Sequence, residues 1–430
     1  MSKMKKVLII TYYWPPAGGP GVQRVLKFAK YLPEFGWQPI ILTVKNGEYP
    51  AIDESLIKEI PKECIVYKTK TFEPYNLYKK FVGKKKDEKL PTHILNTNKN
   101  DNLNNKIAKW IRANLFIPDA RIGWISHIVR EGMKIIENEK PDIIFSSSPP
   151  HSLQIGAKKL AKKSGLKWVA DFRDPWTDYF GIKDLSHTKI TKKLNLNLEK
   201  SCLENADKIV SVSKSLNDLF KKKIKNNYFI IPNGFDAIDF QNISKEKNNK
   251  FKITYIGSIR KSQNPEMFFA SLSKLKSEVL DKIEINFYGS TFPSVISTIK
   301  KYKFVDKIKL HKYISHKNIP KILINSNMLL LIIPNTSNNE GILPGKLFEY
   351  LATENYILGI GPKDSDASEI LKKTNCGKMY NYDEDLSQII LEQFKNWGNG
   401  KKQNVNNEAI KQYTRKKLTE KLVNIFEKLV

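Results

Sequence analysis

Short apolar runs alternate with amphipathic stretches along the chain, and the alternation forms two successive arrays of similar size. Short β-rich runs bounded by Gly, Pro or Asn are typical of buried parallel strands, and the stretches between them have helical spacing. The pattern predicts an α/β protein with two Rossmann-like domains. The first array has its predicted strands in residues 7–13, 39–44, 141–152, 167–178, 206–220 and 228–236. The second array has them in residues 251–266, 282–290, 307–315, 328–335 and 356–362.

The two arrays are separated by a polar run, residues 243–250, which we interpret as a linker. We expect an N-terminal domain in residues 1–236 and a C-terminal domain in residues 237–410. A basic helix is predicted for residues 411–430.

The formal net charge is +29, which raises nucleic acid and anionic membranes as partners. Only seven of the 73 basic residues are Arg, the residue that makes bidentate contacts to bases and phosphates. Because no nucleic-acid-binding motif occurs either, we expect no nucleic-acid partner. Residues 79–106 are basic, Asn-rich and low in complexity, which predicts a surface insertion. The segment after it, residues 107–116, is predicted to be a basic amphipathic helix that either meets an anionic membrane surface or covers the domain core.

The lengths of the apolar runs and the spacing of the cysteines indicate the cellular compartment. No apolar run approaches the ~20 residues that cross a bilayer. The N-terminal run ends in Pro-Pro without a small-residue cleavage site, so it is predicted to be a strand and not a signal peptide. The three cysteines are far apart and lack zinc-site spacing, which fits a reducing cytoplasm.

The stretch NTSNNEGILPGKLFEYLAT, residues 335–353, runs from a Gly-containing loop into a helix. Free backbone N–H groups at a helix start suit a phosphate, and Glu349 inside that helix can accept hydrogen bonds from sugar hydroxyls. The same sequence is also compatible with an ordinary loop-to-helix turn in which the glutamate is solvated.

A second glycine-rich turn, GGPGVQR in residues 18–24, follows the first strand. It differs from the dinucleotide fingerprint because Arg24 replaces the third glycine, and the second strand ends without an acidic residue for a ribose. We therefore expect no nicotinamide site. The loop can still hold a phosphate or a sugar, or its glycines only turn the chain.

Three polar residues follow predicted strands of the first array: His151, Asp171 and Arg173. Ligands of open parallel sheets bind beyond the carboxyl ends of the strands, which makes these residues catalytic candidates. His151 also fits a structural role, and Arg173 with Asp174 also fits an internal ion pair that shapes the loop.

Six segments occur in the order found in one enzyme family: GGPGVQR, SSPPHS, DFRDPW, IPNGFD, YIGSIRKSQNP and PGKLFEYLA. Together they resemble the family-4-type retaining glycosyltransferases of the GT-B fold, in the subgroup typical of bacterial surface-polysaccharide and lipopolysaccharide assembly. The resemblance covers most of the chain apart from residues 79–106. It implies two Rossmann-like domains that face each other across a cleft, with the C-terminal helix packing back on the N-terminal domain.

The resemblance also implies an activity and its partners. The enzyme would transfer a sugar, with retention, from a UDP- or GDP-linked donor to a glycan acceptor that is lipid-linked. It would work in the cytoplasm, as a peripheral protein on the inner face of the cell membrane. No cofactor and no metal are implied, because cationic side chains and backbone N–H groups stabilise the departing diphosphate.

The resemblance assigns residues to the nucleotide-sugar donor. Glu349 matches the glutamate that holds the donor ribose, and Arg260 and Lys261 stand in the turn whose basic residues neutralise the diphosphate. His151 matches a position that contacts the sugar near its reacting centre, and it forms the catalytic set with Asp171 and Arg173. The implied donor-binding set is Gly18, Gly19, Gly257, Arg260, Lys261, Glu340, Leu343, Pro344, Gly345, Lys346 and Glu349.

One position departs from the family pattern. Gly341 stands where relatives carry a first glutamate, eight residues before Glu349, and Glu340 lies one residue early. A nucleotide-sugar epimerase of the same fold and a non-catalytic glycan- or nucleotide-binding relative are the alternative functions. The former needs acid/base carboxylates and no acceptor; the latter fits a loss of the first glutamate.

Overall fold

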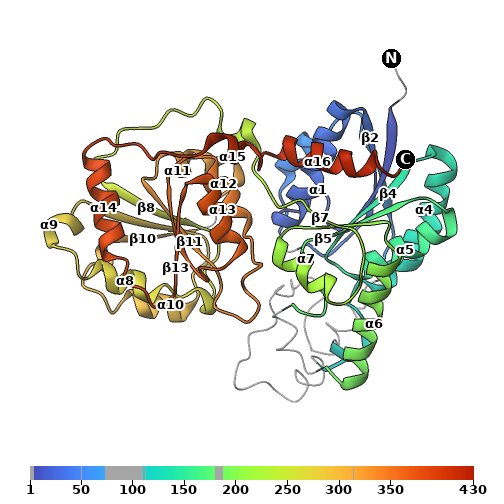
Figure 1. Ribbon diagram of the computed structural model, residues 1–430, viewed down its shortest axis with the longest axis horizontal. Helices are drawn as coiled ribbons and strands as arrows, with labels where there is room; N and C mark the ends of the chain where they lie inside the picture. The colour runs from blue at the N-terminus through green and yellow to red at the C-terminus, as the bar shows by residue number, and fades with distance from the viewer. Residues whose placement is uncertain (1–3, 50, 73–109, 112, 180–186, 313) are drawn as a thin grey trace. The chain divides into compact units, whose positions relative to one another are not determined.

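The computed structural model describes residues 4–49, 51–72, 110–111, 113–179, 187–312 and 314–430. The predicted insertion, residues 79–106, and part of the helix predicted after it lie outside these residues. The chain forms two compact units, shown in Figure 1. Unit 1 comprises Met1–Pro232 and Leu418–Val430, and unit 2 comprises Asn233–Lys417.

Unit 1 is built on a parallel sheet in which the strand order is β3-β2-β1-β4-β5-β6-β7. Order reverses between β1 and β4, so the carboxyl ends of these two strands form the topological switch point where α/β sheets bind ligands. The strands are β1 (Lys5–Thr11), β2 (Trp37–Val44), β3 (Ile65–Thr69), β4 (Ile143–Ser148), β5 (Trp168–Phe172), β6 (Lys208–Ser211) and β7 (Tyr228–Ile230).

Helices cover both faces of this sheet because consecutive residues of β1 point to opposite sides. Leu8 and Ile10 join one buried cluster with α4 and α5 residues, whereas Val7 and Ile9 join another with α1 and α16 residues. The helices of unit 1 are α1 (Pro20–Tyr31), α4 (Ile125–Glu139), α5 (Ser152–Ser164), α6 (Lys189–Asn205), α7 (Lys214–Lys221) and the part of α16 (Arg415–Phe426) from Leu418 onward.

The last helix is held in unit 1 by aromatic packing. The ring of Phe426 lies 5.2 Å from that of Trp37 and 5.8 Å from that of Phe145, and it is fully buried. The predicted helix 411–430 is wrong at its start, since α16 begins at Arg415. Before it, Phe235 donates to the Tyr413 carbonyl and accepts from the Arg415 amide, so this segment forms a β-bridge.

Unit 2 repeats the architecture with the strand order β10-β9-β8-β11-β12-β13, again parallel throughout. Its switch point lies between β8 and β11. Its strands are β8 (Phe251–Ile256), β9 (Ile283–Tyr288), β10 (Ile308–His311), β11 (Met328–Ile332), β12 (Tyr356–Ile360) and β13 (Gly377–Tyr380). Its helices are α8 (Glu266–Leu272), α9 (Ser277–Leu280), α10 (Pro293–Ile299), α11 (Ile319–Ile324), α12 (Gly345–Leu351), α13 (Asp366–Thr374), α14 (Ser387–Gly398) and α15 (Asn407–Lys411).

Short 3₁₀ helices complete the connections: η1 (Leu32–Phe35), η2 (Glu54–Glu59), η3 (Ile122–Trp124), η5 (Ala237–Phe240), η6 (Lys261–Gln263), η7 (Val305–Lys307) and η8 (His316–Asn318). Within the described part of the chain, no helix combines the length and apolar character that crossing a membrane requires. The prediction of an α/β protein with two Rossmann-like domains is confirmed by the two parallel sheets.

Candidate active-site residues

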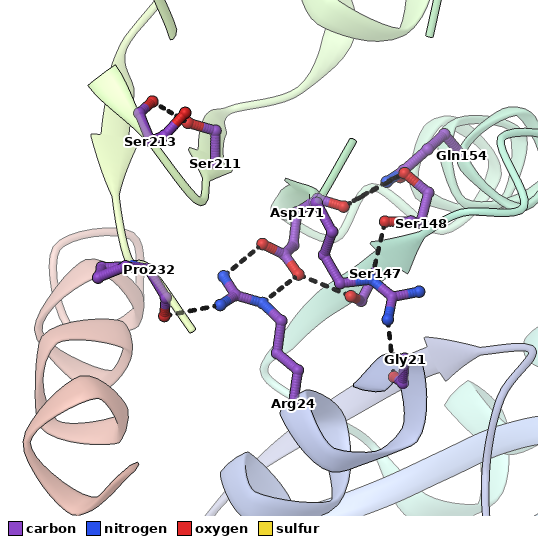
Figure 2. Close-up of polar contacts among 10 residues, drawn as sticks. Gly21, Arg24, Ser147, Ser148, Gln154, Asp171, Ser211, Ser213 and Pro232 are labelled. Atoms are coloured by element: carbon purple, nitrogen blue, oxygen red, sulfur yellow. Dashed lines mark hydrogen bonds and ion pairs between the residues drawn. The ribbon is translucent and has the colours of Figure 1, made fainter. Parts of the chain in front are cut away.

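The carboxyl ends of β4 and β5 in unit 1 are joined to α1 by a buried ion pair, drawn in Figure 2. Arg24 donates through Nε and Nη2 to the two carboxylate oxygens of Asp171, at 2.9 and 2.7 Å. Ser147 donates to the same carboxylate at 2.6 Å, and the third arginine nitrogen, Nη1, donates to the carbonyl of Pro232 at 3.0 Å. Both charged side chains are completely buried.

This network changes the expectation for Asp171. Its side chain has no exposed surface and both of its oxygens are engaged. A carboxylate in this setting does not meet a substrate; it holds the first turns of α1 against β5. Arg24, which departs from the dinucleotide fingerprint, is its counter-charge.

Arg173 ties the loop after β5 to two neighbouring segments. Its guanidinium donates to three backbone carbonyls: Ser148 at 3.0 Å, Pro149 at 2.8 Å and Gly21 at 2.7 Å. Burial lowers the pKa of Arg173, while the charge of Asp174 raises it. Arg173 therefore fixes the loops that surround His151, and Asp174 acts on it through charge.

His151 is held flat at the start of α5. Its ring stacks on that of Trp176, with centroids 4.9 Å apart and planes within 6°. Burial lowers the pKa of His151 to about 4, although the charge of Asp119 acts to raise it. The imidazole is thus neutral at pH 7. Its Nδ1 is buried and has no hydrogen-bond partner among the described residues.

Asp119 also orders the helix behind His151. Its two carboxylate oxygens accept from the backbone N–H and the hydroxyl of Ser152, each at 2.8 Å. This satisfies an N–H group in the first turn of α5.

The two N-terminal glycines have different surroundings. Gly18 is packed against Ala51 and Asp53, and its N–H donates to the Ala51 carbonyl at 2.9 Å, so this N–H is already used. Gly19 is exposed, has a φ of 97° and leaves open space around a Cβ position. Of the pair, Gly19 offers the approachable backbone.

In unit 2, Lys346 lies beside the glycine turn that follows β8. A Cβ on Gly257, which has a φ of 108°, would sit 3.0 Å from the Lys346 ammonium nitrogen. That nitrogen lies 3.7 Å from the centroid of the Tyr255 ring. Burial lowers the pKa of Lys346 to about 7; the charge of Glu349 raises it and that of Arg260 lowers it further. The chain therefore brings Gly257, Lys346 and Glu349 together.

Glu349 has a partner that the sequence did not indicate. Its Oε1 lies 2.9 Å from Nε2 of His316, which begins η8. Both side chains are partly exposed. The imidazole fixes the carboxylate at the rim of α12 while leaving it reachable.

The remaining donor candidates lie in two loops of unit 2. Arg260 and Lys261 are exposed at the start of η6, and this turn is anchored to the end of β11 by Gln263, which donates to the Ile332 carbonyl at 3.0 Å. Leu343, Pro344 and Gly345 lead into α12, which has only seven residues and thus a small dipole.

Glu340 is exposed in the loop between β11 and α12. Its backbone carbonyl accepts from the Asp366 amide at 2.9 Å, and its charge contributes to the raised pKa of Tyr382. The hypothesis that its carboxylate takes the place of the missing first glutamate stays a prediction.

The model of the family "Glycosyltransferase Family 4" matches residues 93–238. No curated protein matches the sequence.

Solved structures resemble the whole chain at low identity. They include a sucrose-phosphate synthase from Thermosynechococcus elongatus (11% identity, 99% of both chains covered, TM-score 0.66). A glycosyltransferase from Rickettsia africae is 16% identical over 99% of this chain and 98% of its own, with a TM-score of 0.63. Anabaena HepE in complex with UDP is 11% identical over 99% and 100%, with a TM-score of 0.66.

These likenesses identify the fold as GT-B, the architecture of two Rossmann-like domains. The predicted resemblance to family-4 glycosyltransferases is confirmed over the residues that the family model matches.

Proposed function

We propose that the protein is a glycosyltransferase that moves a sugar, with retention, from a nucleotide-sugar donor to a glycan acceptor. The observation that carries the proposal is the set formed by Gly257, Lys346 and Glu349 at the switch point of unit 2. A glycine turn and a partly desolvated cation suit the diphosphate of a nucleotide sugar, and an anchored carboxylate suits its ribose. The family match and the fold likeness support the same class.

Donor binding follows from the chemistry of these residues. Lys346 pairs with the diphosphate, and the exposed Arg260 and Lys261 add charge from the neighbouring turn. Glu349, held by His316, accepts hydrogen bonds from the ribose hydroxyls. Since α12 is short, we assign the backbone of Leu343 to Gly345 a positioning role and leave most of the charge neutralisation to the side chains.

In the proposed reaction, the bond between the sugar C1 and the diphosphate oxygen breaks. An acceptor hydroxyl oxygen bonds to C1 on the same face, and its proton passes to the departing phosphate. The neutral His151 hydrogen-bonds the sugar near C1. Asp171 and Arg173 act as positioning residues. The Asp171 carboxylate is buried in an ion pair, and all three Arg173 guanidinium nitrogens donate to backbone carbonyls.

The donor proposal is tested by thermal shift with a panel of UDP- and GDP-sugars, because a bound donor stabilises the fold. Glu349→Ala should weaken binding by at least about 1 kcal/mol, the cost of a hydrogen bond to a charged group. Glu369→Ala removes an exposed glutamate on α13 and should change nothing. Equal affinity in both variants would reject the ribose assignment. Donor turnover that is independent of any acceptor would favour the epimerase.

A lipid-linked acceptor requires the enzyme at a membrane, and we propose that α6 makes the contact. Ile190 is 73% exposed and Leu194 is 45% exposed on this helix. Thr188, the residue before α6, donates its amide N–H to Asn114 Oδ1 at 2.8 Å, and Leu115, next to Asn114 in the chain, is a third exposed apolar residue. Exposed lysines of α6 flank these apolar residues: Lys189, Lys192 and Lys193. Apolar side chains with flanking cations suit an anionic lipid surface.

Vesicle flotation tests this contact. Wild-type protein should float with phosphatidylglycerol vesicles and not with phosphatidylcholine vesicles, and Ile190→Glu with Leu194→Glu should abolish flotation. Ile57→Glu with Ile238→Glu alters exposed residues elsewhere and should leave it intact. Equal flotation of the two double variants would place the contact outside α6.

A further inference from the structure

A cavity of about 340 Å³ opens in unit 1, and none of the residues assigned above lines it. It lies at the carboxyl ends of β1, β2 and β3: Trp14 follows β1, Thr43 and Val44 end β2, and Lys68 is the penultimate residue of β3. Because all strands of this sheet are parallel, these ends share one edge with the residues that follow β4 and β5. The cavity is lined by Trp14, Pro15, Pro16, Thr43, Val44, Lys45, Asn46, Gly47, Tyr49, Ile52 and Lys68.

Two aromatic side chains form preordered walls of this cavity. Tyr49 is held by ring contacts to Tyr12 and Tyr13, with centroids 6.1 and 6.5 Å apart. A Cβ on Gly47 would lie 2.8 Å from the Tyr49 ring, so any larger residue at position 47 would clash with the ring in this position. Flat, fixed aromatic faces are suited to a ring such as a pyranose.

Trp14 adds an unused donor. Its side chain is 1% exposed, and its Nε1 is buried without a hydrogen-bond acceptor among the described residues. An indole N–H can only donate, and a buried donor left unpaired is destabilising. A ligand oxygen in the cavity would supply the missing acceptor.

The cavity is cationic. Lys45 and Lys68 line it, both are exposed, and neither makes a side-chain hydrogen bond or ion pair with another described residue. No carboxylate is present among the lining residues. Two uncompensated ammonium groups beside a polar, aromatic-walled cavity favour an anionic ligand.

We propose that this cavity binds an anionic sugar, a pyranose ring that carries a phosphate or a carboxylate. The ring lies against Trp14 and Tyr49, its oxygen accepts from the Trp14 indole, and its anionic group pairs with Lys45 and Lys68. Resting on the proposed function, the cavity is the acceptor subsite, and the acceptor is a charged glycan or sugar phosphate.

Calorimetric titration of the full chain with glucose 1-phosphate, glucuronic acid and glucose tests the proposal. The anionic sugars should bind at least tenfold more tightly than glucose at low salt. Lys45→Gln with Lys68→Gln should abolish this preference. Lys58→Gln with Lys62→Gln removes two exposed lysines outside the cavity, with the same change of net charge, and should retain it.

A sugar phosphate can also meet the cations of unit 2, so Lys346→Gln is titrated in parallel. Retained binding there, with loss in Lys45→Gln and Lys68→Gln, supports the cavity. The reverse pattern, or equal binding of glucose and the anionic sugars, overturns the proposal. Donor binding is measured by thermal shift in the same variants. If no nucleotide sugar stabilises the wild type, the transferase proposal fails while the result for the anion in the cavity stands.

Discussion

The lowered pKa of Lys346 predicts that donor affinity depends on pH in a way that one substitution removes. With a pKa of about 7, this lysine is half-protonated at neutral pH when no ligand is bound. A diphosphate binds the protonated form, so binding must take up a proton wherever the free lysine is neutral. Donor affinity is therefore highest below pH 7 and falls as the pH rises above it.

The size of the effect follows from linkage. Each pH unit above the free-state pKa costs about 1.36 kcal/mol for protonating the amine, until the pKa of the bound state is reached. Because the free lysine is already half-neutral at pH 7, the loss between pH 7 and pH 9 amounts to about 2.3 kcal/mol, or roughly a 50-fold loss of affinity. An exposed lysine, with a pKa near 10.4, would give almost no change over this range.

The assay is calorimetric titration of the preferred nucleotide sugar from pH 6 to pH 9. Lys346→Gln should bind weakly with a flat profile, whereas Lys372→Gln, which alters an exposed lysine of α13, should behave like the wild type. A flat profile in the wild type, or a pH-dependent one in Lys346→Gln, would refute the assignment.

Stability of the ligand-free protein gives an independent check with a defined sign. Unfolding returns the pKa of Lys346 from about 7 to its ordinary 10.5, so between these values the unfolded chain binds more protons. The contribution of this lysine to the free energy of unfolding thus rises as the pH increases from 7 towards 10. The difference between wild type and Lys346→Gln isolates this contribution, and a decrease with pH would contradict it.

Three further predictions concern the other assigned residues. Asp171→Asn leaves Arg24 buried without its counter-charge and should lower the free energy of unfolding in urea by about 3–5 kcal/mol; Asp218→Asn, in an exposed pair with Lys214, should change it by less than about 1 kcal/mol, and equal effects would contradict the buried pair. His151→Ala should reduce turnover more than donor affinity in steady-state assays, and an unaffected rate would leave the ring a structural role. EDTA should leave activity intact, because side-chain cations neutralise the diphosphate; a strict metal requirement would contradict this account.

The fold was predictable because buried parallel strands carry a strong local signal. The runs around Leu8, Phe145, Val169 and Leu330 are continuous apolar segments, and each lies buried in a strand. The break before α16 was not predictable in this way. It depends on Phe235, nearly 180 residues earlier, which occupies the backbone groups around Thr414.

The candidate site was predictable only as far as the edge of the sheet. A strand end tells which side of the sheet a residue approaches, but not what its side chain meets. Asp171 ends a strand as expected, yet Arg24, from the first helix, takes both of its oxygens. Because Arg is rare in this Lys-rich chain, the presence of Arg24 was a usable signal for this ion pair.

Other partners left no signal in the sequence. His316 lies 33 residues before Glu349 and meets it only through the packing of η8 beside α12. Asp119 orders the start of α5 from a loop 33 residues before Ser152. Tertiary packing, not local pattern, sets such pairs.

The basic residues of the candidate donor site differ in exposure, and this difference predicts different roles in donor binding and in the chemical step. The family resemblance gave neutralisation of the diphosphate to Arg260 and Lys261, and a planar guanidinium is best at paired contacts to phosphate. Arg260 is exposed, however, so water screens its charge, whereas Lys346 lies against the Tyr255 ring and has lost enough hydration to lower its pKa. A cation that has lost its hydration before the donor arrives interacts more strongly with charge that develops on the departing diphosphate. We therefore expect loss of the exposed basic residues to slow donor capture, and loss of Lys346 to reduce the rate of the chemical step.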